Sequence, residues 1–214
     1  MNFYQELQKT LEKESGKGKS LLLHSCCAPC SSHVLMLLKE YFTITVLYYN
    51  PNITQHEEYR KRVQEQIRFI EALNKDMGGA DISYMDGNYV PEKFLEAVKG
   101  YEQIPEGGAR CKICFEMRLE ETARLAKEGG FDYFATTLTV SPLKNASLLN
   151  EIGLEMGERF GVEYLISDFK KKDGYKHSIE LSAQYGLYRQ DYCGCAFSKA
   201  ERYAGKEQIS PVGK

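Results

Sequence analysis

The sequence contains no apolar stretch long enough to cross a membrane and no apolar leader of the kind that directs secretion. A membrane helix needs about 20 consecutive apolar residues, and no segment approaches that length. The start of the chain, residues 1–19, is polar with scattered apolar positions, unlike the apolar core of a secretory signal. We therefore expect a cytoplasmic protein.

A strong net charge is also absent. The chain has 28 Lys and Arg residues against 30 Asp and Glu residues, which gives a formal net charge of -2. This balance excludes a globally basic nucleic-acid-binding protein but permits a local basic patch. With 214 residues, 43% of them hydrophobic and 27% charged, the composition indicates a globular protein.

Neither an internal repeat nor a low-complexity linker divides the chain. Apolar residues near helical spacing in 3–14, followed by Gly16 and Gly18, predict a short N-terminal helix and a linker. We expect this helix and linker to occupy residues 1–18, a single α/β catalytic domain to occupy 19–205, and a C-terminal tail to occupy 206–214.

Predicted strands and helices alternate along the rest of the chain. The strands are expected at 21–24, 42–49, 82–85, 131–139 and 163–166, and the helices at 31–41, 57–75, from 91, and at 112–127, 146–160, 177–185 and 196–203. This alternation predicts an α/β fold with a Rossmann-like, mainly parallel sheet covered by helices on both faces. Ligands of such sheets bind beyond the carboxyl ends of the strands, and several cysteines follow predicted strand ends.

All seven cysteines belong to groups. The groups are Cys26, Cys27 and Cys30; Cys111 and Cys114; and Cys193 and Cys195. Cysteines used as small apolar residues would be scattered singly. In a reducing compartment, clustered thiols more often bind metal or perform redox chemistry. The grouping predicts a cysteine-rich metal site of the zinc or iron–sulfur type.

Two alternatives explain part of this pattern. The segment Cys27-Ala28-Pro29-Cys30 has the C-x-P-C form of a thioredoxin-like thiol oxidoreductase, placed between a strand and a helix N-terminus. That reading leaves the other cysteines unexplained. A zinc-stabilised interaction module would pair Cys27 and Cys30 with Cys111 and Cys114, across a much longer connection than a zinc ribbon normally has.

The third group, Cys193-Gly194-Cys195, has one residue between its thiols. Gly194 permits the tight ring of a C-x-C disulfide, and such a strained bond is easily reduced. Metal ligation is the competing role for this pair. We favour a redox-active dithiol.

The motifs together resemble the QueH family of epoxyqueuosine reductases. The stretches that carry the resemblance are HSCCAPCS, YYNPNI, EYRKR, GGARCKICFEMRLEETA, FDYFATTLTVSPLKN, DFKKKDGY and LYRQDYCGC. They extend from residue 24 to residue 195 in the expected order, so the resemblance covers most of the chain. The combination is specific, whereas a single C-x-x-C motif would be weak evidence.

The resemblance implies reduction of epoxyqueuosine to queuosine at the wobble position of a tRNA anticodon, the last step of queuosine biosynthesis. It also implies a 4Fe-4S cluster, with Cys193 and Cys195 as a redox-active pair. The matching cluster ligands are Cys26, Cys27, Cys111 and Cys114. Cys30 is placed to bind an additional iron ion or to replace one of those ligands.

The implied reaction needs two electrons and two protons, and therefore an external electron donor. Asp191 and Tyr192 are candidate proton donors because they precede the C-x-C pair. Candidate tRNA contacts are Lys170, Lys171, Lys172, Tyr188 and Arg189. The segment TTLTVSPLKN begins as a strand and turns at Pro142. Four of its residues either line the site or cap the next helix, namely Thr137, Ser141, Lys144 and Asn145.

Overall fold

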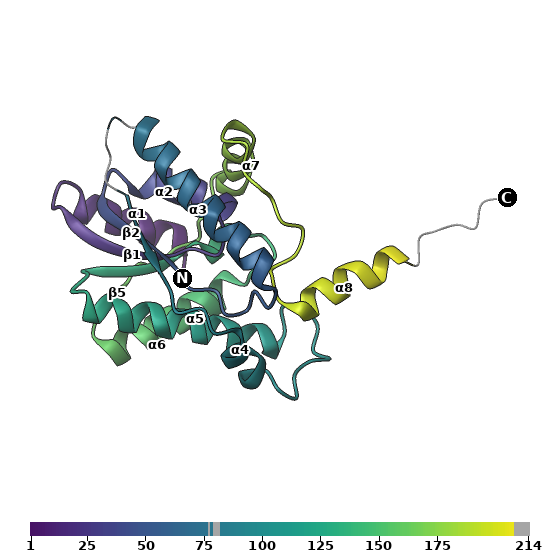
Figure 1. Ribbon diagram of the computed structural model, residues 1–214. Helices are drawn as coiled ribbons and strands as arrows, with labels where there is room; N and C mark the ends of the chain where they lie inside the picture. The colour runs from purple at the N-terminus through teal and green to yellow at the C-terminus, as the bar shows by residue number, and fades with distance from the viewer. Residues whose placement is uncertain (77, 79–81, 208–214) are drawn as a thin grey trace.

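The computed structural model describes residues 1–76, 78 and 82–207. Its centre is a five-stranded sheet in the order β3-β2-β1-β4-β5, and all neighbouring strands are parallel (Figure 1). The strands are β1 (Lys19–His24), β2 (Phe42–Tyr48), β3 (Ser83–Asp86), β4 (Tyr133–Thr136) and β5 (Glu163–Tyr164). The predicted α/β class with a parallel sheet is confirmed.

Helices connect and cover these strands on both sides (Figure 1). They are α1 (Phe3–Glu14), α2 (Ala28–Leu38), α3 (His56–Asp76), α4 (Pro91–Ala97), α5 (Ala109–Glu128), α6 (Ala146–Phe160), α7 (Gly174–Gln184) and α8 (Ala196–Glu207), with a 3₁₀ helix η1 (Thr137–Val140). Helix α8 extends away from the rest of the chain (Figure 1). None of the helices in the described ranges is both long and apolar enough to span a membrane.

The apolar run of strand β1 is explained by burial of both of its faces. Leu21 and Leu23 contribute to one core, together with residues of α1, α2 and α3. Leu22 points to the opposite face and contributes to a second core with α5 and α6. Both faces of the strand are buried, so its sequence shows no alternation of apolar and polar residues. Leu7 of α1 belongs to the first core, and so the N-terminal helix packs on the sheet.

Two element boundaries differ from the prediction in ways that affect the site. The strand expected at 131–139 ends at Thr136, where the chain turns into η1. The hydroxyl of Thr136 accepts a hydrogen bond from the N–H of Leu138 and caps this turn. Helix α2 begins at Ala28 instead of residue 31, with Cys27 as N-cap and proline in its first turn. Cys30 therefore lies within the helix.

Helices α5 and α7 also begin earlier than predicted. Helix α5 starts at Ala109, directly after a glycine-rich loop at 105–108, so Cys111 and Cys114 both lie in its first two turns. Helix α7 starts at Gly174 and packs beside α2, where His33 Nδ1 lies 3.0 Å from His177 Nδ1. A side chain at Gly174 would collide with the His33 ring, because its Cβ would lie 2.6 Å from Nε2.

Candidate active site

The cysteine groups converge on one cavity of about 390 Å³. Cys26 enters it from the end of β1, and η1 brings Leu138 and Val140 to it from the end of β4. The cysteines that line it are Cys26, Cys30, Cys111, Cys114, Cys193 and Cys195. Three segments, each about 80 residues of chain from the next, thus supply sulfur atoms to one space at the carboxyl ends of the strands.

The first group forms a compact set of sulfur atoms. The Sγ atoms of Cys26, Cys27 and Cys30 all lie within 4.8 Å of one another. Cys27 is buried, whereas Cys26 and Cys30 are partly exposed to the cavity. A set of three mutually close thiols suits a soft metal that prefers sulfur ligands. It also means that Cys27 and Cys30 do not form an isolated thioredoxin-like pair.

Buried polar contacts fix the strand end that carries this group. The Nδ1 atom of His24 lies 2.9 Å from the hydroxyl of Thr136 on β4, and its Nε2 lies 3.1 Å from the carbonyl oxygen of Tyr49. The hydroxyl of Ser25 donates to the Oε1 atom of Gln66 at 2.8 Å. These side chains are fully buried, so the backbone that presents Cys26 is held rigidly.

The three thiols share negative charge unequally. Hydrogen bonding with Cys27 and Cys30 holds the pKa of Cys26 well below its ordinary value. The same contact with Cys26 raises the pKa of Cys27 to about 12, and the pKa of Cys30 is also raised. Cys26 is therefore the thiol of this group that ionises most readily, and the three thiols do not titrate independently. Binding of a metal would displace the remaining protons, because thiolates are the ligands.

Helix α5 presents the second group. Cys111 and Cys114 are one turn apart and lie on the same side of the helix, which faces the cavity. The N–H of Gly107 donates a hydrogen bond to the Sγ atom of Cys111 at 3.2 Å. Burial raises the pKa of Cys114 to about 11. The early helix start is what brings both thiols to the cavity wall.

Arg118, one turn after Cys114, places a positive charge at the same wall. Its side chain is only 4% exposed, and its Nε atom donates to the carbonyl oxygen of Cys114 at 3.1 Å. Within the described residues, no carboxylate forms an ion pair with this guanidinium. Burial opposes the charge of Arg118, but the neighbouring Cys114 and Cys26 sulfurs raise its pKa. A buried cation facing sulfur atoms fits an anionic, thiolate-bound metal group.

The third group lies on the loop between α7 and α8. The Sγ atoms of Cys193 and Cys195 are 3.6 Å apart. Cys193 is partly exposed and Cys195 is buried, where its sulfur accepts a hydrogen bond from the N–H of Ser198 at 3.3 Å. Gly194 is required between them, because its φ is +119° and a Cβ there would lie 2.7 Å from Cγ1 of Ile53.

All seven cysteines are free thiols in the described residues, so the predicted disulfide between Cys193 and Cys195 is not supported by this structure. Their sulfur atoms, 3.6 Å apart, are separated by more than the roughly 2.05 Å of a disulfide bond. The distance is nevertheless short enough for the two thiols to share a proton.

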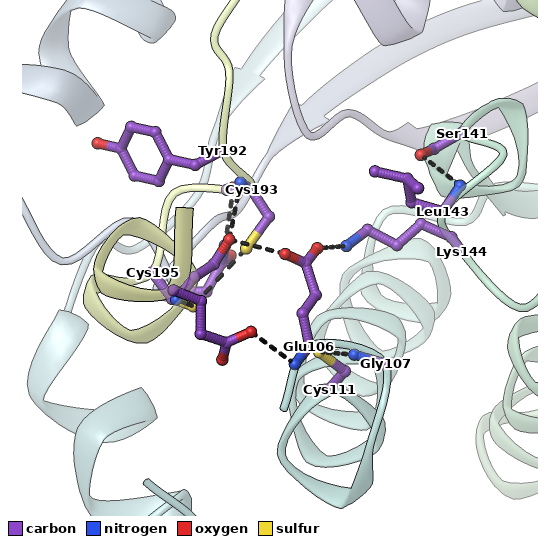
Figure 2. A network of polar contacts seen from close by, with 12 residues as sticks. Glu106, Gly107, Cys111, Ser141, Leu143, Lys144, Tyr192, Cys193 and Cys195 are labelled. Carbon is purple, nitrogen blue, oxygen red and sulfur yellow. Dashed lines mark hydrogen bonds and ion pairs between the residues drawn. The ribbon is translucent and has the colours of Figure 1, made fainter. Parts of the chain in front are cut away.

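A polar network surrounds the dithiol (Figure 2). Glu106, from the glycine-rich loop, accepts hydrogen bonds from Lys144 Nζ at 2.8 Å and from the hydroxyl of Ser198 at 2.8 Å. The hydrogen-bonded Cys195 thiol lowers the pKa of Cys193 to about 5, and the charge of Lys144 also lowers it. The pKa of Cys195 is raised by the same contact. The pair therefore carries one negative charge near neutral pH.

Several predicted site residues lie at this cavity. Asp191, Tyr192 and Arg189 line it, as do Ser141 and Lys144. Thr137 and Asn145 have other positions. The hydroxyl of Thr137 accepts a hydrogen bond from the N–H of Cys26 at 3.3 Å, and Asn145 caps α6 by accepting from the N–H of Leu148.

The other predicted tRNA contacts lie outside the cavity lining that the structure describes. Lys170 forms an ion pair with Asp168 at 2.8 Å, and Lys171 and Lys172 are exposed on the following turn. Tyr188 is covered on one side by Lys61, whose Nζ atom lies 3.4 Å from the ring centroid. That face of the Tyr188 ring is therefore not open for stacking on a base.

Three charged residues of the site have no individual signal in the sequence. Arg62, Glu106 and Arg118 each occur in segments rich in other charged residues, which are mostly exposed. Only the three-dimensional structure shows that Arg62 and Arg118 are buried beside cysteines. Their presence in the EYRKR and RCKICFEMRLEETA stretches is the one hint that the sequence contains.

The fold and the site define an α/β protein whose thiols serve metal binding or redox chemistry. A family model described as "Epoxyqueuosine reductase QueH" matches residues 21–201, and the chain belongs to the QueH family.

Curated relatives agree over most of the chain. An epoxyqueuosine reductase QueH of Staphylococcus epidermidis is 42% identical over 214 residues, which cover 98% of this chain and 90% of the relative. One of Thermotoga maritima is 36% identical over 194 residues, which cover 89% of this chain and 96% of the relative. These matches do not favour a zinc-stabilised interaction module or a thioredoxin-like oxidoreductase.

A solved structure shares the fold. The U34-tRNA thiolase NcsA from Methanococcus maripaludis, solved with its [4Fe-4S] cluster, aligns with a TM-score of 0.52 and 14% sequence identity. The alignment covers 97% of this chain and 73% of the thiolase. At this identity the likeness supports the architecture alone.

Proposed function

We propose that the chain is an epoxyqueuosine reductase, which converts epoxyqueuosine to queuosine at the wobble position of tRNA anticodons. Its relatives of 35–43% identity bear that name. The observation that carries the proposal is the convergence of three cysteine groups on one cavity. The proposed place of action is the cytoplasm, with an external electron donor.

The dithiol matches the stoichiometry of this reaction. Removal of the epoxide oxygen as water forms a carbon–carbon double bond and consumes two electrons and two protons. Oxidation of Cys193 and Cys195 to a disulfide releases two electrons and two protons. We assign the pair this role, after which the external donor restores both thiols. Their 3.6 Å separation and the exposure of Cys193 to the cavity support the assignment.

A thiolate-bound cofactor completes the proposal. We assign a 4Fe-4S cluster to four ligands and an additional iron ion or an alternative ligand role to Cys30. The four ligands are Cys26, Cys27, Cys111 and Cys114. When bound, such a cluster supplies one-electron transfer, and an iron can polarise an oxygen atom. The compact Cys26, Cys27 and Cys30 set and the buried charge of Arg118 support this assignment.

Residues around the cavity have supporting roles in the proposal. Lys144, anchored by Glu106, favours the thiolate form of Cys193. Asp191 and Tyr192 lie at the cavity, where either could deliver a proton to the departing oxygen. Arg189 is exposed at the same cavity and is suited to contact tRNA phosphates.

Anaerobic turnover tests this function. The purified protein is incubated with a low-potential reductant and an anticodon stem-loop RNA that carries epoxyqueuosine, and the nucleoside is analysed by mass spectrometry. We expect loss of one oxygen atom and roughly four irons and four sulfides per chain, beyond any additional iron. A colourless protein that retains one zinc per chain and leaves the substrate unchanged would contradict the proposal.

A further inference from the structure

The turn that leads into α6 holds an apolar side chain in solvent. Leu143 is 75% exposed, more than any other large hydrophobic residue among those described, apart from Met1. It nevertheless belongs to the lining of the cavity that contains the thiols. Single exposed leucines are common on protein surfaces, so exposure alone carries no conclusion. Two further observations bear on Leu143, namely the hydrogen bonds that fix its turn and the place of that turn at the cavity.

Contacts on both sides of Leu143 fix the turn (Figure 2). The N–H of Leu143 donates to the hydroxyl of Ser141 at 3.3 Å, and the N–H of Lys144 donates to the carbonyl oxygen of Ser141 at 3.2 Å. The Lys144 side chain is only 11% exposed and ends in its ion pair with Glu106. Asn145 then caps α6. Leu143 is therefore the exposed member of an anchored turn.

The lining of the same cavity combines apolar and cationic groups. Tyr175 is 38% exposed and lines the cavity, which also includes the exposed Arg189 and Arg202. Neither arginine forms an ion pair with a carboxylate among those recorded for the described residues. Exposed guanidinium groups beside aromatic and aliphatic side chains match single-stranded nucleic acid, which offers phosphates and unstacked bases.

The proposed substrate has to leave its stack to react. The thiols lie inside the cavity, whereas the wobble nucleotide is stacked within the anticodon loop. Enzymes that act on a base draw it out of the stack, and apolar side chains often fill the space that is vacated. From these observations we propose that Leu143 is a wedge that packs against the nucleobases flanking the extruded wobble nucleotide. This inference rests on the proposed function and adds a means of recognising the tRNA.

The test uses Leu143→Ala, with Leu95→Ala as the matched control. Leu95 is 43% exposed on α4 and does not belong to the cavity lining described. The probe is an anticodon stem-loop RNA with epoxyqueuosine at the wobble position and the fluorescent base 2-aminopurine beside it. Binding is measured without reductant and with the Cys193–Cys195 dithiol oxidised beforehand, because the two reduced thiols could otherwise support one turnover.

We expect wild-type protein and Leu95→Ala to increase the 2-aminopurine fluorescence, which reports unstacking. For Leu143→Ala we expect most of the increase to be lost and the affinity to fall about tenfold, within the range of a lost stacking contact. Leu143→Met should retain the wild-type fluorescence increase and affinity. With reductant, the ratio of kcat/KM for the stem-loop to kcat/KM for the free nucleoside should fall about tenfold in Leu143→Ala.

The wedge proposal would be overturned if Leu143→Ala matched the wild type in fluorescence increase, affinity and kcat/KM ratio. That result would leave the proposed reductase function intact. Equal losses in Leu143→Ala and Leu95→Ala would overturn it as well. If the wild-type protein reduces epoxyqueuosine in neither the stem-loop nor the free nucleoside, the proposed function itself fails. The assay with the free nucleoside separates this failure from a failure of the wedge proposal alone.

Discussion

Arg62 donates a hydrogen bond from its NH1 group to the carbonyl oxygen of Cys193 at 3.2 Å. Its NH2 group reaches the preceding carbonyl, that of Tyr192, at 3.4 Å, and its Nε donates to Glu58 at 2.7 Å. The Arg62 side chain is 2% exposed. The backbone that carries the first thiol of the pair is thus held by a buried guanidinium from α3, far away in the sequence.

Arg62→Lys should loosen the dithiol loop without removing the charge. Lysine cannot reproduce the planar fork that reaches two carbonyls and a carboxylate. We expect a loss of about 2 kcal/mol in the free energy of unfolding and at least a tenfold lower kcat. Urea denaturation and anaerobic turnover measure both. Arg60→Lys, an exposed position on the same helix, is the control, and equal effects of the two substitutions would refute the clamp.

Cys193→Ser tests whether Cys193 is a redox thiol or a metal ligand. If Cys193 is a redox thiol, the variant keeps its iron, sulfide and brown colour but loses turnover by at least 100-fold. Iron analysis and visible absorption, recorded alongside the assay, check this expectation. Loss of the chromophore would instead make Cys193 a ligand.

Lys144→Met should weaken the thiolate of Cys193. The pKa of this thiol is lowered to about 5, so in the wild type its alkylation rate should rise through that pH and then level off. Without Lys144 the midpoint should move upward, toward the roughly 8.5 of a free thiol. Iodoacetamide labelling, followed by peptide mass spectrometry from pH 4 to 9, measures the shift. Lys112→Met on the exposed side of α5 should leave the profile unchanged.

Arg118→Gln should make the proposed cluster harder to reduce. Reduction adds negative charge, and the buried guanidinium stabilises that charge, so its removal should lower the midpoint potential. Arg118→Lys should retain most of the wild-type value. Redox titration followed by electron paramagnetic resonance gives the potentials. Arg124→Gln is the control because Arg124 is 40% exposed and pairs with Glu121 and Glu128. An unchanged potential in Arg118→Gln would refute the assignment.

His33→Gln should reduce the loss of stability in mild acid. Burial, with a contribution from His177, lowers the pKa of His33 to about 4, whereas an unfolded histidine has a pKa of about 6.5. As the pH falls from 6.5 toward 4, the unfolded chain binds a proton that the folded chain resists, so stability falls. Urea midpoints at pH 7.5 and 5 should differ less in His33→Gln than in the wild type. His56→Gln, at the exposed start of α3, should retain the wild-type difference.

Local patterns in the sequence were sufficient for most of the fold. The period of apolar residues in 146–160 and the apolar run at 21–24 predicted α6 and most of β1. Several of the boundaries that were wrong lie beside the site. Cys27 to Cys30 reads as a loop because cysteine gives no helix signal, yet proline in the first turn starts α2 at Ala28. Thr136 ends β4 through a side-chain cap that strand propensity does not register.

The site was predictable where the residue type itself carries the chemistry. Cysteines have few other reasons to cluster, so their grouping indicated one centre before any geometry was known. Arginine and glutamate gave no such signal, because their usual place is the surface. Arg118 and Glu106 became recognisable only when burial and partners were known. The triple lysine, by contrast, was chosen for its charge and for its place after a predicted strand end, and these three residues are not among those that line the cavity.

Strand β1 is central in the sheet although it is made first, and its partner β4 is made only after residue 132. The last sulfur atom of the cavity belongs to Cys195. A growing chain on the ribosome therefore has no complete cavity until Cys195 has emerged. The four proposed cluster ligands are all made by Cys114, so the proposed cluster site and the dithiol are completed at different stages of synthesis.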